Sequence, residues 1–393
     1  VYNEMKGALS DPDAVLYDAL SAALFPDTTY RFESGGTPAG IPTLTYEAYL
    51  DAHARHYRPD NSYIMLYGDL DPDRFLGFLA DEYLDPLADV PRGPLDANPL
   101  ALQAAVEAPG VRATMATAPE NACAALGFVI GEAAERERIV AADILLDAIA
   151  GSNEAPLKRA LLDAGLAADA QAFVADSVAQ PFAVVSLRGI APGCDDVLGR
   201  FEAVVRSEAA RLADGALDRS LVRAALSHAE FVMREHSFGY PDGVAYAVSS
   251  MAGWLYDDSL AFAYLRYEDV FASLRAKVDE GYFEDLLRRL VLEGHHRASV
   301  ELVPVEGEGD AAERERLDAL AAAMGPADFE AIQAEVDALR AVQEAPDAPA
   351  DLAKLPHLSV GDIGSAPPEP AFALQEGLPL PCLRHQVGTN GIA

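Results

Sequence analysis

The chain has 393 residues, 51% of them hydrophobic, and carries 63 acidic against 29 basic residues, a formal net charge of −34 at pH 7. This length allows two or three domains, and the apolar content excludes wholesale disorder. The charge excludes general nucleic-acid binding through phosphate neutralisation and favours cationic partners. No apolar run reaches the roughly 18 residues that a membrane-spanning helix needs. Three scattered cysteines, in neither metal nor disulfide spacing, indicate a reducing compartment: Cys123, Cys194 and Cys382.

The first block alternates helical and extended patterns. Glu4 lies in VYNEMKG, where we expect a strand to join a helix. Asp11 and Pro12 predict a helix start, because Asp caps a helix N-terminus and Pro fits its first position, and Pro26 predicts the end. The remaining elements expected in this block are a loop over 32–42, a helix over 46–57 capped by Thr45, a strand over 62–70 and a helix over 72–84.

A second block follows a proline-containing linker at about 85–110. The expected strands are 111–117, 122–131, 181–190 and, as the closing strand, 296–305. The expected helices are 136–151, ending at Gly151, and 157–165, with long helical patterns over 193–294. Residues 311–344 predict a helical hairpin broken at Gly325-Pro326, and 382–393 are strand-like. Because strands and helices do not alternate with βαβ spacing, the predicted fold class is α+β.

No local motif identifies a catalytic site. H-E-x-x-H, H-x-x-E-H, G-x-S-x-G and the Walker loop are all missing from the sequence. His53 and His56, three residues apart on a predicted helix, could ligate a metal, but tyrosines and a leucine on the same face favour packing. His295 and His296 precede a strand and point apart, so surface positions are expected. Glu4, judged alone, is a glutamate placed favourably near a helix N-terminus.

Several segments in order along the chain nevertheless resemble one family. They are VYNEMKG with SDPD, residues 24–71, LKRALLDAGL, FGYPDGVAYAVSSMAGWLYDDS, GHHRASVELVP, the hairpin, and VGTNGIA at the end. Together they resemble the presequence-protease subfamily of the insulinase/pitrilysin zinc metallopeptidases. The resemblance implies α+β domains of that type, each with a mainly antiparallel sheet and flanking helices, and a helical-hairpin linker.

The resemblance also implies a domain division and a metal ligand. Residues 1–92 match the C-terminal part of the first peptidase domain, 93–306 the complete second domain, 307–350 the linker and 351–393 the start of the third domain. In this family two histidines of an H-x-x-E-H motif and a later glutamate hold zinc, and the glutamate inside the motif is the general base. The position that matches the later glutamate is Glu4. The motif is expected upstream of Val1, so the general base lies outside this sequence and the chain alone is expected to be inactive.

The function that the resemblance implies is that of a fragment of an ATP-independent zinc metalloendopeptidase. It would degrade unfolded peptides, basic ones among them, in a closed chamber formed with the other half of the same polypeptide. We expect a bacterial cytoplasmic location, without nucleic-acid or membrane partners. The alternatives are a non-catalytic structural or peptide-binding member of the family, and an unrelated acidic scaffold. The sequence upstream of Val1 would distinguish the first two.

Overall fold

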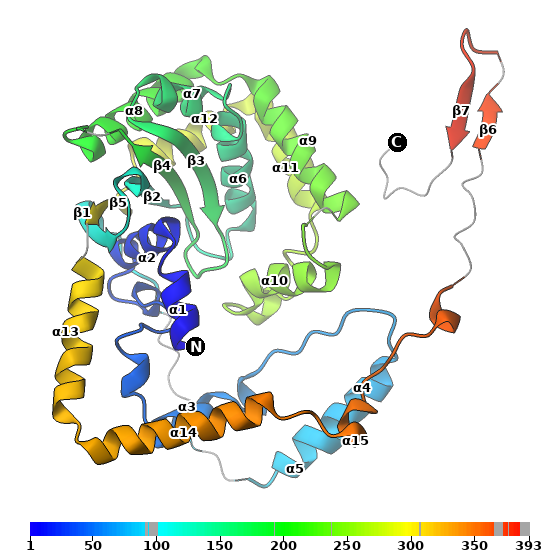
Figure 1. The fold of residues 1–393 in the computed structure, drawn as a ribbon. Helices are drawn as coiled ribbons and strands as arrows, with labels where there is room; N and C mark the ends of the chain where they lie inside the picture. The colour runs from blue at the N-terminus through cyan, green and yellow to red at the C-terminus, as the bar shows by residue number, and fades with distance from the viewer. Residues whose placement is uncertain are drawn as a thin grey trace. The chain divides into compact units, whose positions relative to one another are not determined.

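The computed structural model describes residues 1–90, 93, 101–191, 193–236, 238–305, 308–364, 372–375 and 377–385. The chain divides into two compact units, Val1–Glu306 and Gly307–Ala393. The larger unit contains a sheet with helices on both faces (Figure 1). The predicted boundaries at 92/93, 306/307 and 350/351 stay predictions of domain organisation.

A five-stranded sheet organises the larger unit, in the order β1-β5-β2-β4-β3. Only the β1–β5 pair is parallel, and the other pairs are antiparallel, which confirms the predicted α+β class with a mainly antiparallel sheet. The central strand β2 is apolar throughout because both of its faces are covered. The strands are β1 (Glu107–Ala116), β2 (Cys123–Val129), β3 (Ala167–Ala175), β4 (Phe182–Ile190) and β5 (Arg297–Val305).

Two features of the sheet were not predicted. The edge strand β3 was missed because its sequence, AADAQAFVA, is rich in alanine, which has low strand propensity. The strand predicted to close the block, β5, lies inside the sheet between β1 and β2. Strand order depends on long-range pairing, so the local sequence pattern did not reveal it.

Helix α2 (Pro12–Leu24) covers one face of the sheet. The Asp11 carboxylate accepts a hydrogen bond from the backbone N–H of Asp13 (3.0 Å), and Pro12 occupies the first turn, as predicted. Its buried side chains, with Phe25, meet apolar residues of β2, β4 and β5: Leu16, Leu20 and Leu24 against Ala125, Val184, Val300 and Leu302. Each such leucine contributes roughly 1.5–3 kcal/mol by burial.

Glycine in β2 permits this close approach. A Cβ atom at Gly127 would lie 2.9 Å from Leu24 Cδ1 and 3.0 Å from Leu20 Cδ1. A side chain at this position would therefore force the ends of Leu20 and Leu24 out of their places in the core.

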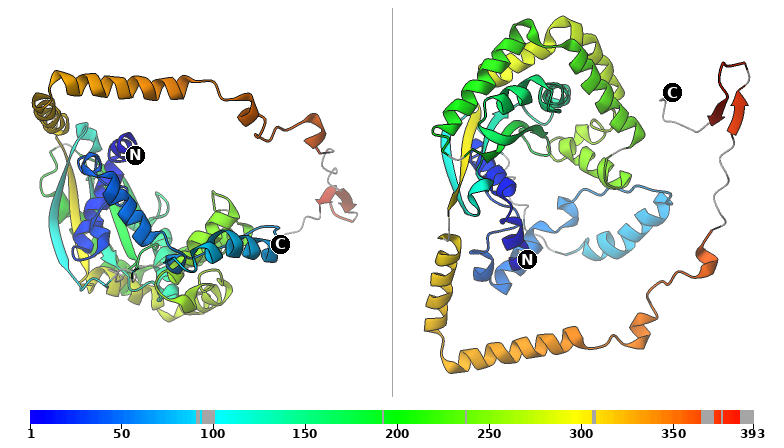
Figure 2. Two further views of the ribbon diagram at one scale, coloured as in Figure 1. Left: turned by 90° about the horizontal axis from the view of Figure 1, so that it is seen from below. Right: turned by 45° about the horizontal axis from the view of Figure 1, so that its top comes forward.

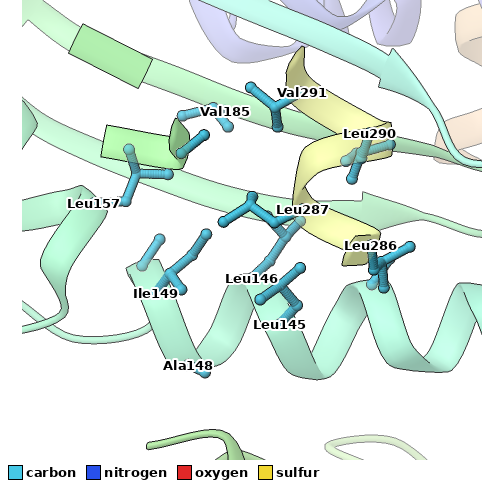
Figure 3. Close-up of a cluster of buried hydrophobic side chains, with 14 of the residues drawn as sticks. Leu145, Leu146, Ala148, Ile149, Leu157, Val185, Leu286, Leu287, Leu290 and Val291 are labelled. Carbon is cyan, nitrogen blue, oxygen red and sulfur yellow. The ribbon is translucent and has the colours of Figure 1, made fainter. Parts of the chain in front are cut away.

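The opposite face is covered by a second core, in which α6 (Arg136–Ala150) is central. Figure 3 shows Leu145 and Ile149 of α6 close to Val185 of β4 and to Leu287 and Leu290. The other helices of this unit are α1 (Tyr2–Ala8), α3 (Tyr46–His56), α4 (Pro72–Leu79), α5 (Asp85–Leu87), α7 (Pro156–Asp163), α8 (Val197–Arg211), α9 (Arg219–Glu235), α10 (Asp242–Trp254), α11 (Glu268–Lys277) and α12 (Tyr282–Leu287). The predicted helices at 46–57, 72–84, 136–151 and 157–165 are thus confirmed.

The strand predicted at 62–70 is wrong. Within the described part of the chain, residues 62–67 are not paired into a sheet. Instead, two of its tyrosines contact α10: the Tyr63 ring meets Trp254 with centroids 4.6 Å apart, and Tyr67 meets Tyr246 at 5.4 Å. An apolar run rich in aromatic residues is typical of a strand, but a strand also needs a backbone partner, and aromatic contacts hold this segment instead.

The apolar face of α3 also differs from the prediction. Thr45 caps the helix as expected, accepting from Ala48 N–H (3.2 Å). The tyrosines and leucine predicted to pack are solvent-exposed, with 70% of Tyr46 and 61% of Tyr49 accessible. Sequence periodicity identified an amphipathic helix, but it does not report whether a covering surface is present.

The smaller unit contains the predicted helix pair, α13 (Glu308–Ala323) and α14 (Pro326–Glu344), followed by α15 (Pro349–Leu352) and a two-stranded ladder of β6 (Phe372–Gln375) and β7 (Cys382–His385). Gly325 and Pro326 separate the helices as expected, and the Asp328 carboxylate accepts from Gly325 N–H (2.8 Å). Figure 2 shows α13 and α14 diverging at this break, so they do not lie side by side as a packed hairpin would. Strand β7 confirms part of the strand-like end, whereas 386–393, including VGTNGIA, lie outside the described residues. Among the described helices, none is long and apolar enough to cross a bilayer.

Candidate functional site

Glu4 lies in the short helix α1, which includes Tyr2 and Asn3, so the strand expected just before Glu4 is helical in the structure. Its carboxylate is in the first turn, a position that the helix dipole favours. The side chain is exposed, and it makes no hydrogen bond or ion pair with any other described residue. Its neighbour Met5 is buried and anchors the helix, since a Cβ atom at Gly35 would lie only 2.3 Å from Met5 Sδ. The local structure thus presents a single unpaired carboxylate to solvent.

The described residues do not form a zinc site on their own. No group of three or more His, Cys, Asp or Glu side chains in the described part of the chain is arranged to hold a metal ion. Protein zinc sites use three or four such ligands. Glu4 can supply one ligand, so the chain as it stands does not fit zinc.

The predicted histidines are not metal ligands in this structure. The His53 ring stacks on Tyr57 with centroids 4.5 Å apart, and both His53 and His56 are exposed on α3. His295 is exposed as predicted and bonds Glu107 (2.8 Å). The surface position predicted for His296 is wrong: its ring is half-buried, bonds the Leu24 carbonyl (2.8 Å) and has a pKa lowered by burial.

A three-residue cluster at the turn between α9 and α10 has the composition of a catalytic triad but not its geometry. His236 Nδ1 lies 2.8 Å from Asp242 Oδ2. The Tyr246 hydroxyl lies 2.9 Å from His236 Nε2 and 3.3 Å from Nδ1. An oxygen almost equally distant from both ring nitrogens sits over the imidazole face, so His236 cannot accept its proton along a ring lone pair.

The buried cysteine Cys123 is not a reactive nucleophile. Cys123 is buried in β2, and burial raises its pKa to about 12. A thiol with this pKa stays protonated at neutral pH, whereas the thiolate is the reactive form.

A cavity of about 370 Å³ lies beside α1, which forms one wall through Met5, Ala8 and Leu9. Its other walls come from α2 and from β3 and β4, where Phe173 and Val184 line it. The helix that carries Glu4 is therefore part of a pocket between α2 and the sheet.

Charged groups line this cavity. Arg188 of β4 forms a two-point ion pair with Asp13, with Nε–Oδ1 at 2.8 Å and Nη2–Oδ2 at 2.6 Å. Asp13 and Asp18 both lie on α2. The pKa of Asp18 is raised to about 6, first by burial and then by a hydrogen bond with Glu33 and repulsion from it. Glu33 in turn accepts from Gly35 N–H (2.9 Å). The arrangement holds Asp18 protonated at mildly acidic pH, with its proton shared with the Glu33 carboxylate.

Sequence reasoning did not identify Asp18, Glu33 or Arg188. Each comes from a different segment, and only tertiary packing brings them together. The one available signal was Asp18 between the core leucines Leu16 and Leu20, a carboxylate at the edge of a buried helix face.

Comparison with known proteins places the chain. The model of the peptidase M16 inactive domain matches residues 43–227, and that of the segment associated with subfamily C of the M16 peptidases matches 304–393. Protein HypA of Clostridium perfringens is 31% identical over 402 residues, covering 100% of this chain and 40% of HypA. Presequence protease 1 of Arabidopsis thaliana, chloroplastic/mitochondrial, is 29% identical over 415 residues, covering 100% of this chain and 37% of that protein.

Structural comparison gives the same fold. The solved M16 inactive domain from Pseudomonas fluorescens superposes with a TM-score of 0.56 at 17% identity, covering 77% of this chain and 69% of that one. The chain spans about two fifths of the length of the curated relatives named above. These findings confirm the family resemblance seen in the sequence, with presequence proteases among the relatives. The chain belongs to the M16 peptidase family, and it carries the family's inactive domain and the segment associated with subfamily C.

Proposed function

We propose that this chain is part of a longer zinc metalloendopeptidase that degrades unfolded peptides in a closed chamber, and that Glu4 is one of its zinc ligands. The observation that carries the proposal is the placement of Glu4. Its carboxylate is exposed and without a partner among the described residues. It lies on α1, the helix that forms one wall of the cavity of about 370 Å³. The segment around it is the one that resembles the family's third-ligand segment.

The remaining ligands and the general base would come from the rest of the longer protein. The two curated relatives named above are more than twice as long as this chain, which supports such a division. On this proposal the partner of the chain is the other part of the same polypeptide, and it works in the bacterial cytoplasm.

A second candidate function is a non-catalytic, peptide-binding or structural role. One observation favours it: the matching family model describes an inactive domain. The two functions differ in whether the longer protein cleaves peptides at all.

Peptide cleavage separates the two. The 393-residue chain, mixed with unfolded peptides and zinc, should give no cleavage by mass spectrometry, because one carboxylate cannot fix zinc in a four-coordinate site. The longer protein should cleave the same peptides, and a chelator should stop it. Chelator-sensitive cleavage by the pure chain would contradict the assignment of the missing ligands, and a longer protein without activity would favour the non-catalytic role.

A further inference from the structure

A second cavity, of about 610 Å³, lies between α6, β3, α9, α10 and α11, separate from the one beside Glu4. Most of its lining is apolar, with Ile139 and Ile144 from α6, Val232 and Met233 from α9, and Val248 from α10. Its volume is in the range of roughly 300–1,000 Å³ that ligand pockets occupy. It can therefore hold more than one side chain of a ligand.

Three carboxylates interrupt this apolar lining. Asp143 and Asp147 lie one helical turn apart on α6, and Asp176 directly follows β3. Among the described residues Asp143 has no hydrogen-bond or ion-pair partner, and Asp176 accepts only from Ser177 Oγ (3.2 Å).

The basic side chains that line the cavity already face other carboxylates. Arg136 Nη2 lies 3.6 Å from Asp269 Oδ1, and His228 Nδ1 lies 3.8 Å from Asp147 Oδ2. Two carboxylates, those of Asp143 and Asp176, thus remain without a cation among the described residues. The cavity combines apolar walls with uncompensated negative charge.

The environment of Asp143 shows the cost of that charge. Its side chain is solvent-exposed and lines the cavity. The pKa of Asp143 is raised to about 6 by burial first, and then by Asp176 and Asp147. A cation that enters the cavity would relieve this repulsion.

We propose that this cavity binds an arginine side chain of an extended peptide, with the guanidinium between Asp143 and Asp176 and the neighbouring apolar residues on the walls. This inference rests on the proposed peptide-degrading function and names a subsite for it. Charge complementarity selects a cation, and the apolar walls select one that is weakly hydrated. The ring of Tyr264 also lines the cavity, and an aromatic face favours a planar guanidinium over an ammonium group.

The subsite predicts a definite pH dependence. Arginine binding needs Asp143 ionised, and its pKa of about 6 makes it largely protonated at about pH 5 and ionised at about pH 7.5. Affinity should therefore fall about tenfold between these two pH values. The other charged or titratable groups that line the cavity with Asp143 are Arg136, Asp147, Asp176, His228, Tyr240, Tyr264 and Tyr267. Since these remain in Asp143→Asn, that variant isolates the share of the pH dependence due to Asp143.

The test uses the zinc-free 393-residue chain and two fluorescent hexapeptides. One has a single arginine between apolar residues, and the other has citrulline, a neutral analogue of similar shape, in its place. At about pH 7.5 the chain should bind the arginine peptide roughly tenfold or more tightly by anisotropy. Asp143→Asn and Asp176→Asn should each reduce that ratio about fivefold, and Asp163→Asn, the same charge change on α7 outside the cavity, should leave it unchanged.

Equal affinity for the two peptides, or the same ratio in Asp143→Asn and Asp163→Asn, would overturn the subsite. Because Asp176 lies outside the helix, its variant tests the same charge if Asp143→Asn does not fold. Binding is measured without catalysis, so the two proposals can fail separately. If the chain binds the arginine peptide selectively but the longer protein does not cleave peptides, only the proposed function is refuted. If the longer protein cleaves peptides but the chain binds the arginine and citrulline peptides equally, only the subsite is refuted.

Discussion

The Asp18 carboxyl group lies beside Glu33 in the cavity next to α1. Its pKa is raised from 3.8 to about 6, so the folded chain binds this proton more tightly than the unfolded chain does. Stability from this group is therefore complete below about pH 4 and is lost as pH rises through about 6. Above that range the two carboxylates repel each other.

Asp18→Asn should remove this repulsion. At about pH 4 the Asp18 side chain is neutral in the folded chain and about half neutral in the unfolded one, so the variant should differ least from wild type in free energy of unfolding. At about pH 7.5 the variant should gain stability relative to wild type, by up to about 1 kcal/mol after allowing for solvent screening. Urea unfolding of the variant and the wild type at the two pH values gives the difference in their free energies of unfolding. Taking this difference cancels the contribution of the other acidic residues, which both proteins share. The same variant-minus-wild-type difference at both pH values would show that the carboxyl pair does not share a proton.

Residue roles in both cavities could not be predicted from the sequence. Asp18 and Glu33, like Asp143 and Asp176, are separated along the chain and meet only in the folded structure. Glu4 was found by family resemblance, because its local pattern is that of any helix-start glutamate. The structure adds that it is exposed and unpaired among the described residues.

At the level of elements, predictions succeeded where the signals are local. Asp11 and Pro12 determine the start of α2, because capping and the fixed proline φ act within one turn. Strand predictions failed where pairing is long-range: 62–67 has a strand-like apolar sequence without a backbone partner, and β3 has a partner with an alanine-rich sequence. Strand existence and order depend on neighbours that the local sequence does not contain.

Packing of α2 against the sheet gives a prediction at this level. Leu20 is fully buried between α2 and the sheet, so Leu20→Ala should lower the free energy of unfolding by about 2–5 kcal/mol. Leu76→Ala on the exposed face of α4 removes the same atoms from a side chain that is 58% accessible, and should cost about 0.5 kcal/mol or less. Urea unfolding of both variants checks the contrast. Equal losses would mean that α2 does not stabilise the sheet.

For the whole molecule, the net charge of −34 must produce a negative potential, and a closed chamber would concentrate it. If part of this charge faces bound peptides, the longer protein should capture basic peptides faster than acidic ones of equal length. The Debye length falls from about 10 Å at 0.1 M salt to about 3 Å at 1 M, so this preference should collapse over that range. The measurement is kcat/KM for a matched basic and acidic peptide at several salt concentrations. A ratio near one that does not change with salt would assign the charge to solubility alone.

The central claim is that Glu4 is a zinc ligand of a longer peptidase. The most direct test is the zinc content of that protein with Glu4→Gln, set against Glu47→Gln, the same change in the first turn of the exposed helix α3. Glutamine keeps the shape but loses the charge that balances Zn²⁺, so zinc affinity should fall by roughly tenfold or more. After dialysis against a zinc buffer, elemental analysis should find about one zinc per molecule in the wild type and in Glu47→Gln, and much less in Glu4→Gln. Stoichiometric zinc in Glu4→Gln would contradict the claim.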